Sequence, residues 1–180
     1  MPQKALIIID VQNALCSGEY KTFNSENVIS TINSLSNVAR KKQLPVIFVQ
    51  HQAKDGPLKE QSKGWQLAEG LIKEEDDIIV QKRFSDAFKD TDLAAQLSSL
   101  DVSELVICGM QSEFCVDSTL RHALSRGFSI TVVSDAHTTL DTRVLDAKTI
   151  SAHHNETWAN ISSYKYTPKV MSAKAIEESL

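Results

Sequence analysis

The stretch Leu105-Val-Ile-Cys-Gly-Met-Gln-Ser-Glu-Phe-Cys-Val116 joins two segments of different hydrophobic period. Residues 105–108 are a short apolar run that ends at Gly109, which is typical of a strand buried on both faces. Beyond the glycine, apolar residues recur at helical spacing, at Val116, Thr119, Leu120, Ala123 and Leu124. A buried strand that turns into an amphipathic helix is typical of α/β proteins, so this stretch predicts an α/β fold.

The same alternation of apolar runs and amphipathic stretches extends in both directions along the chain. Further strands are predicted at residues 5–9, 46–49, 78–80 and 130–133, with a sixth, edge strand at 161–164. Helical stretches begin near Asn24 or Ser25, at Thr91-Asp92 and at Val144. Strands that alternate with helices form parallel sheets covered on both faces. We therefore predict a three-layer α/β/α, Rossmann-like fold with a mainly parallel six-stranded sheet, in a single domain over residues 1–180.

Composition restricts the classes of function. The chain has 180 residues, 42% hydrophobic and 23% charged, with a net charge of -4. This balance is ordinary for a globular protein and provides no broad basic surface for nucleic acid or anionic membranes. The apolar run at 5–9 is too short to span a bilayer, and three cysteines indicate a reducing compartment rather than a disulfide scaffold. We expect a cytoplasmic protein that acts on a small molecule.

Chemically active side chains follow four of the predicted strands. Asp10, His51 and Lys82 follow the first three strands, and Cys115 follows the fourth strand after a short turn. In open α/β sheets the functional crevice lies beyond the carboxyl ends of the strands. A carboxylate, an ammonium and a thiol that are distant in sequence are therefore expected to meet there.

The thiol of Cys115 is the candidate nucleophile. At a helix start, the partial positive charge would favour a thiolate, and free N–H groups could bind an oxyanion. Asp10 could take the thiol proton, and Lys82 could hold Asp10 ionised. Each residue alone has a structural explanation: an inert buried cysteine, a loop-anchoring aspartate and a surface lysine. Their coincidence at three strand ends favours chemistry.

Four motifs together carry a family resemblance. Besides the stretch at 105–116, they are Ala5-Leu-Ile-Ile-Ile-Asp-Val-Gln12, Ile79-Val-Gln-Lys-Arg-Phe-Ser-Asp-Ala-Phe88 and Val132-Val-Ser-Asp-Ala136. With these motifs the sequence resembles the isochorismatase-like cysteine hydrolase superfamily, which includes isochorismatases, nicotinamidases and N-carbamoyl amidases. The resemblance runs from about residue 4 to about residue 165.

The resemblance implies a Cys-Asp-Lys triad. Cys115 would be the nucleophile, Asp10 the general base and Lys82 the charge that orders the pair. It also implies a cis peptide between Met110 and Gln111, with the N–H groups of Gln111 and Cys115 forming an oxyanion hole. Homodimers or homotetramers are usual in the family, and we expect one here, with residues 170–178 as a terminal helix available for assembly.

One departure from the family concerns metal binding. Nicotinamidases hold a metal through an aspartate and several histidines after the second strand. Here Val49 takes the place of the aspartate, and no histidine lies between His51 and His122. A metal site needs three or more ligands within reach, so we predict no metal and no other cofactor.

The candidate substrate-binding residues are Cys16, His51, Trp65 and Phe84. A bystander role explains Cys16 better, loop packing explains Trp65 and Phe84 at least as well, and a capped or exposed loop histidine explains His51 equally well. The predicted function is hydrolysis of a C–N bond in a small amide, carbamoyl compound or lactam through a covalent acyl-enzyme. Two alternatives stay open at this point. One is vinyl ether hydrolysis of the isochorismatase type, and the other is a non-catalytic binding or scaffold protein with an inert Cys115.

Overall fold

A single sheet of six parallel strands forms the centre of the computed structural model, which describes residues 3–180. The strand order is β3-β2-β1-β4-β5-β6, and every pairing is parallel. The strands are β1 (Gln3–Ile9), β2 (Val46–His51), β3 (Ile78–Lys82), β4 (Val102–Met110), β5 (Ser129–Thr138) and β6 (Lys169–Met171). The predicted parallel α/β sheet is confirmed.

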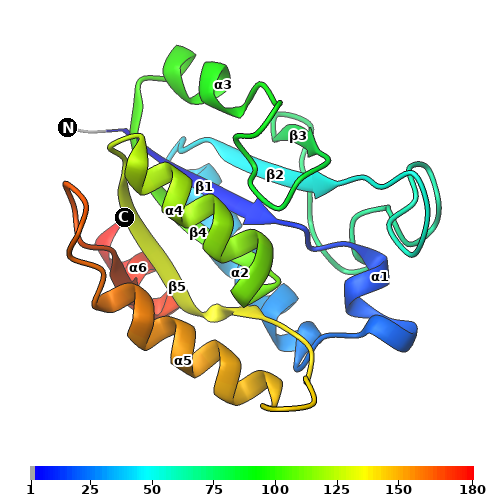
Figure 1. Ribbon diagram of the computed structural model, residues 1–180. Helices are drawn as coiled ribbons and strands as arrows, with labels where there is room; N and C mark the ends of the chain where they lie inside the picture. The colour runs from blue at the N-terminus through cyan, green and yellow to red at the C-terminus, as the bar shows by residue number, and fades with distance from the viewer. Residues whose placement is uncertain (1–2) are drawn as a thin grey trace.

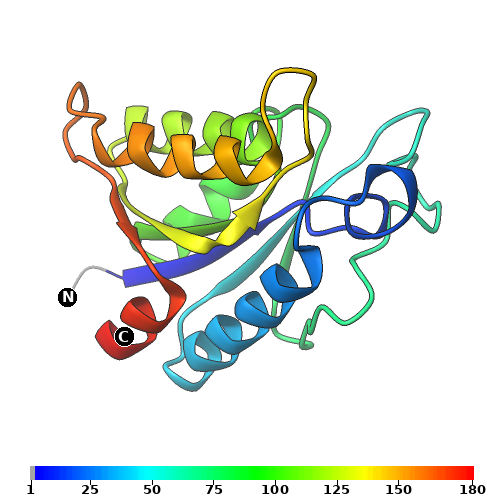
Figure 2. The same cartoon turned by 90° about the horizontal axis from the view of Figure 1, so that it is seen from below.

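Helices cover both faces of this sheet. They are α1 (Asn13–Cys16), α2 (Ser25–Lys41), α3 (Leu93–Ser99), α4 (Asp117–Ser125), α5 (Ala147–Ala159) and α6 (Ala173–Ser179), with a 3₁₀ turn η1 (Gly18–Tyr20) and a π-helical turn η2 (Ser112–Val116). Figure 2 shows α4 and α5 above the sheet and α2 and α6 below it. Among residues 3–180, no helix is long and apolar enough to cross a membrane.

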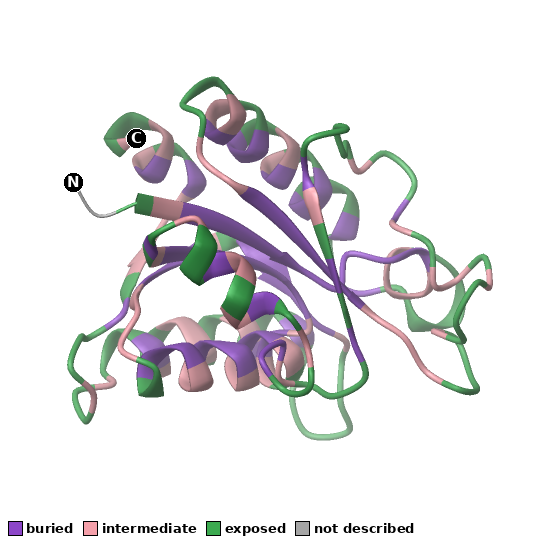
Figure 3. Ribbon diagram, turned by 90° about the horizontal axis from the view of Figure 1, so that it is seen from above, coloured by how far each residue is buried: buried purple, intermediate pink, exposed green. Residues whose placement is uncertain are grey.

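Two hydrophobic cores lie on opposite sides of the sheet. One packs β-strand side chains against α3, α4 and α5, and the other packs the opposite strand faces against α2 and α6. The central strand β1 contributes to both cores, because residues 5–9 are at most 2% exposed. Figure 3 shows this pattern, with buried strands in the interior and exposed helix faces outside. A strand buried on both faces needs the uninterrupted apolar run that the sequence provides.

At Gly109 the backbones of the two central strands leave no room for a side chain. It pairs with Ile9 in the register of β1 with β4, and its φ is +120°, a conformation that side chains rarely adopt. A Cβ atom at this position would lie 2.1 Å from the carbonyl oxygen of Ile9. Only glycine fits, so β4 can pass β1 at this distance directly before the site segment.

The prediction of an edge strand at 161–164 is wrong. Ile161 and Tyr164 instead pack against the core on the α3–α5 side, and the sixth strand lies later, at β6. β6 pairs with β5 through Thr131 and Lys169. The terminal helix is therefore shorter than predicted, because residues 169–171 belong to the sheet and α6 begins at Ala173.

Candidate active site

The carboxyl ends of β1, β3 and β4 bring three predicted site residues together. The Lys82 Nζ atom lies 2.7 Å from Asp10 Oδ2 and 3.2 Å from Cys115 Sγ. Asp10 and Lys82 are each 1% exposed, and Cys115 is half-buried. The parallel direction of the strands, seen in Figure 1, explains why residues so far apart in sequence meet at one edge of the sheet.

The ammonium group of Lys82 is surrounded by more hydrogen-bond acceptors than it has N–H groups to donate. Besides Asp10 and Cys115, it lies 3.1 Å from Nδ1 of His51 and donates to the Phe84 carbonyl at 3.0 Å. An ammonium carries three N–H groups, so four neighbours leave none free. Burial would lower the pKa of Lys82, but the charge of Asp10 and the nearby Cys115 outweigh it and raise the pKa. Lys82 is therefore a fully engaged cation at neutral pH.

Asp10 turns the chain out of β1 towards the site. Its φ is +51°, in the left-handed region that aspartate tolerates better than most residues. Its backbone N–H donates to the Val49 carbonyl, which ties this turn to β2. The carboxylate points at Lys82 through Oδ2, while Oδ1 is buried with no hydrogen-bond partner among the described residues. An unpartnered buried carboxylate oxygen is costly and is free to accept a proton.

Cys115 lies within the π-helical turn η2, before α4 begins at Asp117. The peptide bond between Met110 and Gln111 that precedes this turn is cis, and the Gln111 carbonyl accepts hydrogen bonds from the N–H groups of Phe114 and Val116. Burial and then the charge of Asp10 raise the pKa of Cys115 to about 12, although Lys82 acts in the opposite direction. The effect of the helix start, which favours a thiolate, is therefore outweighed by burial, and the thiol needs a base to take its proton.

A cavity of about 310 Å³ opens onto these groups. Its lining residues are Asp10, Leu15, His51, Leu58, Ser85, Gln111, Phe114 and Cys115. Of the four candidate substrate-binding residues, His51 alone is among them. Leu15, Leu58 and Ser85 come from α1 and from loops, where no hydrophobic period identifies them in advance.

The other three candidates have different contacts. The Cys16 thiol lies 3.7 Å from the Met110 sulfur, behind the site segment. Trp65 contributes its carbonyl to hydrogen bonds with glutamine side chains. Phe84 contributes its carbonyl to Lys82, and its ring, in a residue that is 48% exposed, lies beneath the Lys89 ammonium. The side chains of these three residues are not part of the cavity lining.

Gln12 is a site residue that the sequence analysis missed. Its fully buried side-chain amide donates to the carbonyls of His51 and Trp65, at 2.9 and 2.6 Å, and accepts from the His51 N–H at 3.0 Å. These bonds fix the end of β2 and attach the long β2–β3 loop to it. A glutamine directly after an apolar strand is a signal for such a role, because a buried amide must find partners.

The geometry of the site does not fit a metal ion. Asp10, His51 and Cys115 each offer one ligand atom, and these atoms lie within 4.8 Å of one another. The Lys82 ammonium contacts all three residues, at 2.7, 3.1 and 3.2 Å. A divalent cation among them would be repelled by a positive charge that already uses the same acceptors.

A second polar cluster begins at Ser112, the first residue of η2. The Ser112 hydroxyl lies 2.8 Å from His137 Nδ1, and His137 Nε2 lies 3.0 Å from Asn155 Oδ1. Burial lowers the pKa of His137 to about 4, so the ring is neutral at pH 7. The neutral ring accepts from Ser112 at Nδ1 and donates to Asn155 from Nε2. We refer to Ser112, His137 and Asn155 as the serine cluster, and to Asp10, His51, Lys82 and Cys115 as the cysteine cluster.

Comparison with known proteins gives consistent matches. The model of the isochorismatase domain matches residues 4–162. Streptothricin hydrolase of Streptomyces noursei is 33% identical over 141 residues, covering 78% of this chain and 56% of that protein. The chain thus spans about half the length of the streptothricin hydrolases that it matches.

Two further relatives match over most of their length. The uncharacterized isochorismatase family protein YddQ of Bacillus subtilis (strain 168) is 32% identical over 155 residues, covering 83% of this chain and 85% of that protein. The crystal structure of an isochorismatase family protein has a TM-score of 0.86 at 32% identity, covering 94% of this chain and 98% of that chain.

Proposed function

This chain belongs to the isochorismatase family, and from that premise we propose that it is a hydrolase that cleaves the C–N bond of a small amide, carbamoyl compound or lactam. Cys115 is the nucleophile, Asp10 the general base and acid, and Lys82 the charge that holds both in place. The match to streptothricin hydrolase supports hydrolysis as the reaction class.

One observation carries the proposal. The Cys115 sulfur lies on the wall of a cavity, 3.2 Å from an ammonium that is itself 2.7 Å from a carboxylate with one unpartnered oxygen. The raised pKa of Cys115 keeps the thiol protonated at rest, so the reaction needs a base beside it. Asp10 lies within 4.8 Å of the sulfur and is that base.

In the first half of the reaction, Asp10 takes the thiol proton as the sulfur attacks the carbonyl carbon. The carbonyl oxygen becomes an oxyanion, which the N–H groups of Gln111 and Cys115 receive. Such donors are worth about 3–4 kcal/mol each when they are well placed. The C–N bond then breaks, Asp10 gives its proton to the leaving nitrogen, and the acyl group remains on sulfur as a thioester.

In the second half, water attacks the thioester. Asp10 accepts a proton from the water, the C–S bond breaks, and the proton returns to Cys115. The products are a carboxylic acid and an amine from an amide, a carbamic acid and an amine from a carbamoyl compound, and one amino acid from a lactam, and the enzyme is restored. Lys82 keeps its positive charge throughout, because its pKa is raised.

The test is a panel of small amides, ureas and lactams assayed for release of amine or ammonia. Wild type is compared with Cys115→Ala, and Cys16→Ala is the matched control because Cys16 is a half-buried thiol outside the cavity lining. We expect hydrolysis by wild type and by Cys16→Ala, and a loss of at least about 1,000-fold in Cys115→Ala.

Equal rates in wild type and Cys115→Ala would show that the thiol is not the nucleophile. Turnover of none of these compounds, with Cys115 no more reactive towards iodoacetamide than Cys16, would favour a non-catalytic protein. A vinyl ether is added to the panel for the remaining alternative, and its cleavage without Cys115, with no amide cleaved, would favour the isochorismatase type of reaction.

A further inference from the structure

Among the described residues that line the cavity beside Cys115, none has a side chain that could neutralise an anionic substrate. Its lining has three apolar side chains, Leu15, Leu58 and Phe114, and two neutral polar ones, Ser85 and Gln111. The remaining lining residues, Asp10, His51 and Cys115, belong to the cysteine cluster. Among the described lining residues, the one carboxylate is Asp10, and neither lysine nor arginine is present.

The nearest cation, Lys82, is not available to a ligand. Its side chain is fully buried, and its ammonium already has four acceptors for three protons. A substrate carboxylate would have to displace Asp10 or the Phe84 carbonyl to gain a bond to it. The charges of Asp10 and Lys82 also cancel, so the pair offers no net attraction to an anion.

His51 is the other group that could carry a positive charge, and the geometry keeps it neutral. Its Nδ1 atom lies 3.1 Å from the Lys82 ammonium, which can only donate, so Nδ1 must be an acceptor. Burial and then the charge of Lys82 lower the pKa of His51, against the smaller effect of Asp10. The remaining proton therefore sits on Nε2, which makes the ring a neutral N–H donor.

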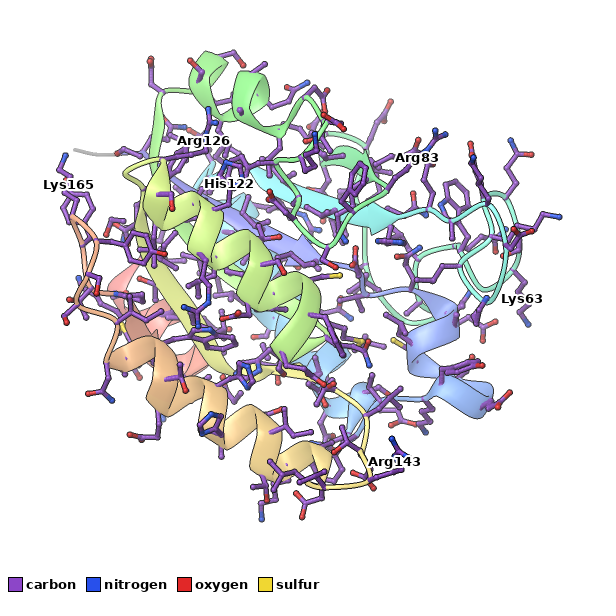
Figure 4. The ribbon with its side chains drawn as sticks, in the orientation of Figure 1. Lys63, Arg83, His122, Arg126, Arg143 and Lys165 are labelled. Atoms are coloured by element: carbon purple, nitrogen blue, oxygen red, sulfur yellow. The ribbon has the colours of Figure 1, made fainter. Side chains whose placement is uncertain are left out.

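Two basic side chains on this side of the molecule, Arg83 and Lys63, are exposed and already paired, and the exposed Lys54 and Lys59 of the β2–β3 loop are not among the residues that line the cavity. Arg83 follows β3, but its side chain is 64% exposed and lies 3.7 Å from Glu60. Lys63 lies on the β2–β3 loop with its side chain 83% exposed, 3.5 Å from Glu69. Figure 4 shows both side chains at the outer edge of the molecule.

We propose that this site selects acyl groups that are uncharged and partly apolar, and that it rejects substrates whose acyl group carries a carboxylate. The inference rests on the proposed hydrolysis and specifies its substrate class. An apolar acyl group would pack against Leu15, Leu58 and Phe114, while the N–H of His51 donates to a neutral polar atom. A carboxylate in the same position would lose its hydration without gaining a counterion, which is strongly unfavourable.

The first experiment compares substrates that differ only in charge. Glutaramide is paired with glutaramate, and terephthalamide with 4-carbamoylbenzoate, so that a neutral amide replaces a carboxylate of the same shape. We expect kcat/KM for the neutral member of each pair to be at least about tenfold higher after correction for its two equivalent amides. Equal or higher values for the carboxylates would overturn the inference and leave the proposed hydrolysis intact.

The second experiment needs no turnover. Alkylation of Cys115 by neutral iodoacetamide and by anionic iodoacetate is followed by mass spectrometry of the peptide, with glutathione as the reference thiol. We expect the ratio of the two rates at Cys115 to exceed the ratio at glutathione by at least about tenfold. The same ratio at Cys115 and at glutathione would overturn the inference whether or not any amide is hydrolysed.

A designed cation sharpens both experiments. Leu58→Arg places a guanidinium at the cavity wall, and Leu58→Gln is the matched neutral variant. If Leu58→Arg does not fold, Phe114→Arg and Phe114→Gln are used in place of this pair. We expect the arginine variant to lower the neutral-to-anionic ratio at least about fivefold and the glutamine variant to leave it unchanged. An equal change in both variants would mean that size, rather than charge, controls selection.

Discussion

Two buried polar clusters each include one residue of the turn η2, and both contain residue types that are found in hydrolases. The cysteine cluster joins a carboxylate, an ammonium and a thiol, and the serine cluster joins a hydroxyl, an imidazole and an amide. Judged by residue type alone, Ser112, His137 and Asn155 would be the more familiar nucleophile, base and orienting group.

The clusters differ in access and in completeness. His137 and Asn155 lie on the wall of a separate cavity of about 260 Å³, but Ser112 is fully buried and is not among its lining residues, and each of its cluster's polar groups has a partner. Cys115 lines a cavity, and the neighbouring Asp10 has an unpartnered oxygen. A complete network around a buried hydroxyl stabilises a fold, whereas an incomplete network beside an accessible thiol can take and return a proton. The comparison teaches that access and a free lone pair identify the reactive cluster better than residue type does.

The largest expected contrast is in turnover. Asp10→Asn removes the base of the cysteine cluster, and we expect kcat to fall by about 10²–10⁴-fold. Ser112→Ala removes one hydrogen bond of the serine cluster and should lower kcat by no more than about tenfold. Steady-state kinetics on the substrate found by the amide panel checks both variants, with circular dichroism to confirm folding. A loss in Ser112→Ala as large as that in Asp10→Asn would reverse the roles of the two clusters.

The next contrast is in stability. Lys82→Met leaves the buried Asp10 carboxylate without its counterion, so we expect the free energy of unfolding to fall by about 3–5 kcal/mol. The double variant Asp10→Asn/Lys82→Met removes both charges and should recover part of this loss. Denaturant unfolding measures both variants. No recovery in the double variant would mean that the cost arises from lost packing around the lysine stem.

The two clusters should also differ in their response to acid. The pKa of His137 is about 4 in the folded protein and about 6.5 when unfolded, so the unfolded state binds more protons between these values. Stability should therefore fall as pH decreases from about 6.5 to 4, by about 3 kcal/mol in total. Unfolding free energies measured across this range should show a shallower decrease in His137→Gln. Equal slopes would indicate that His137 does not control acid sensitivity.

The smallest expected effect concerns Asn155. Asn155→Ala leaves the His137 N–H buried without its acceptor, which costs about 1–3 kcal/mol of unfolding free energy. Asn160→Ala, an exposed position at the end of the same helix, is the matched control and should change stability by less than about 0.5 kcal/mol. Thermal unfolding compares the two variants, and similar shifts would contradict a role for Asn155 in closing the serine cluster.

The sequence predicted the central sheet and the three residues that meet at its edge. This succeeded because buried parallel strands have continuous apolar runs, as at residues 5–9, and because their carboxyl ends converge whatever path the loops take. Asp10, Lys82 and Cys115 could therefore be placed together without knowledge of any contact between them.

Other features depend on contacts that leave no periodic pattern. Residues 161–164 are apolar enough for a strand, yet they pack against the core, and three residues at the sheet edge form β6 instead. The lining residues Leu15 and Leu58 are positioned by loops. The protonation state of Cys115 depends on how deeply it is buried, which sequence position alone could not provide.

The glycine at position 109 has a consequence for protein engineering. A designer who transplants Asp10, Lys82 and Cys115 onto another parallel sheet would copy the reactive atoms but not the separation between their supporting strands. Any side chain at position 109 would collide with the carbonyl of Ile9, so the two strands would have to move apart. The smallest unit that could be transferred to another protein is therefore the three reactive residues together with Gly109, which takes no part in the reaction.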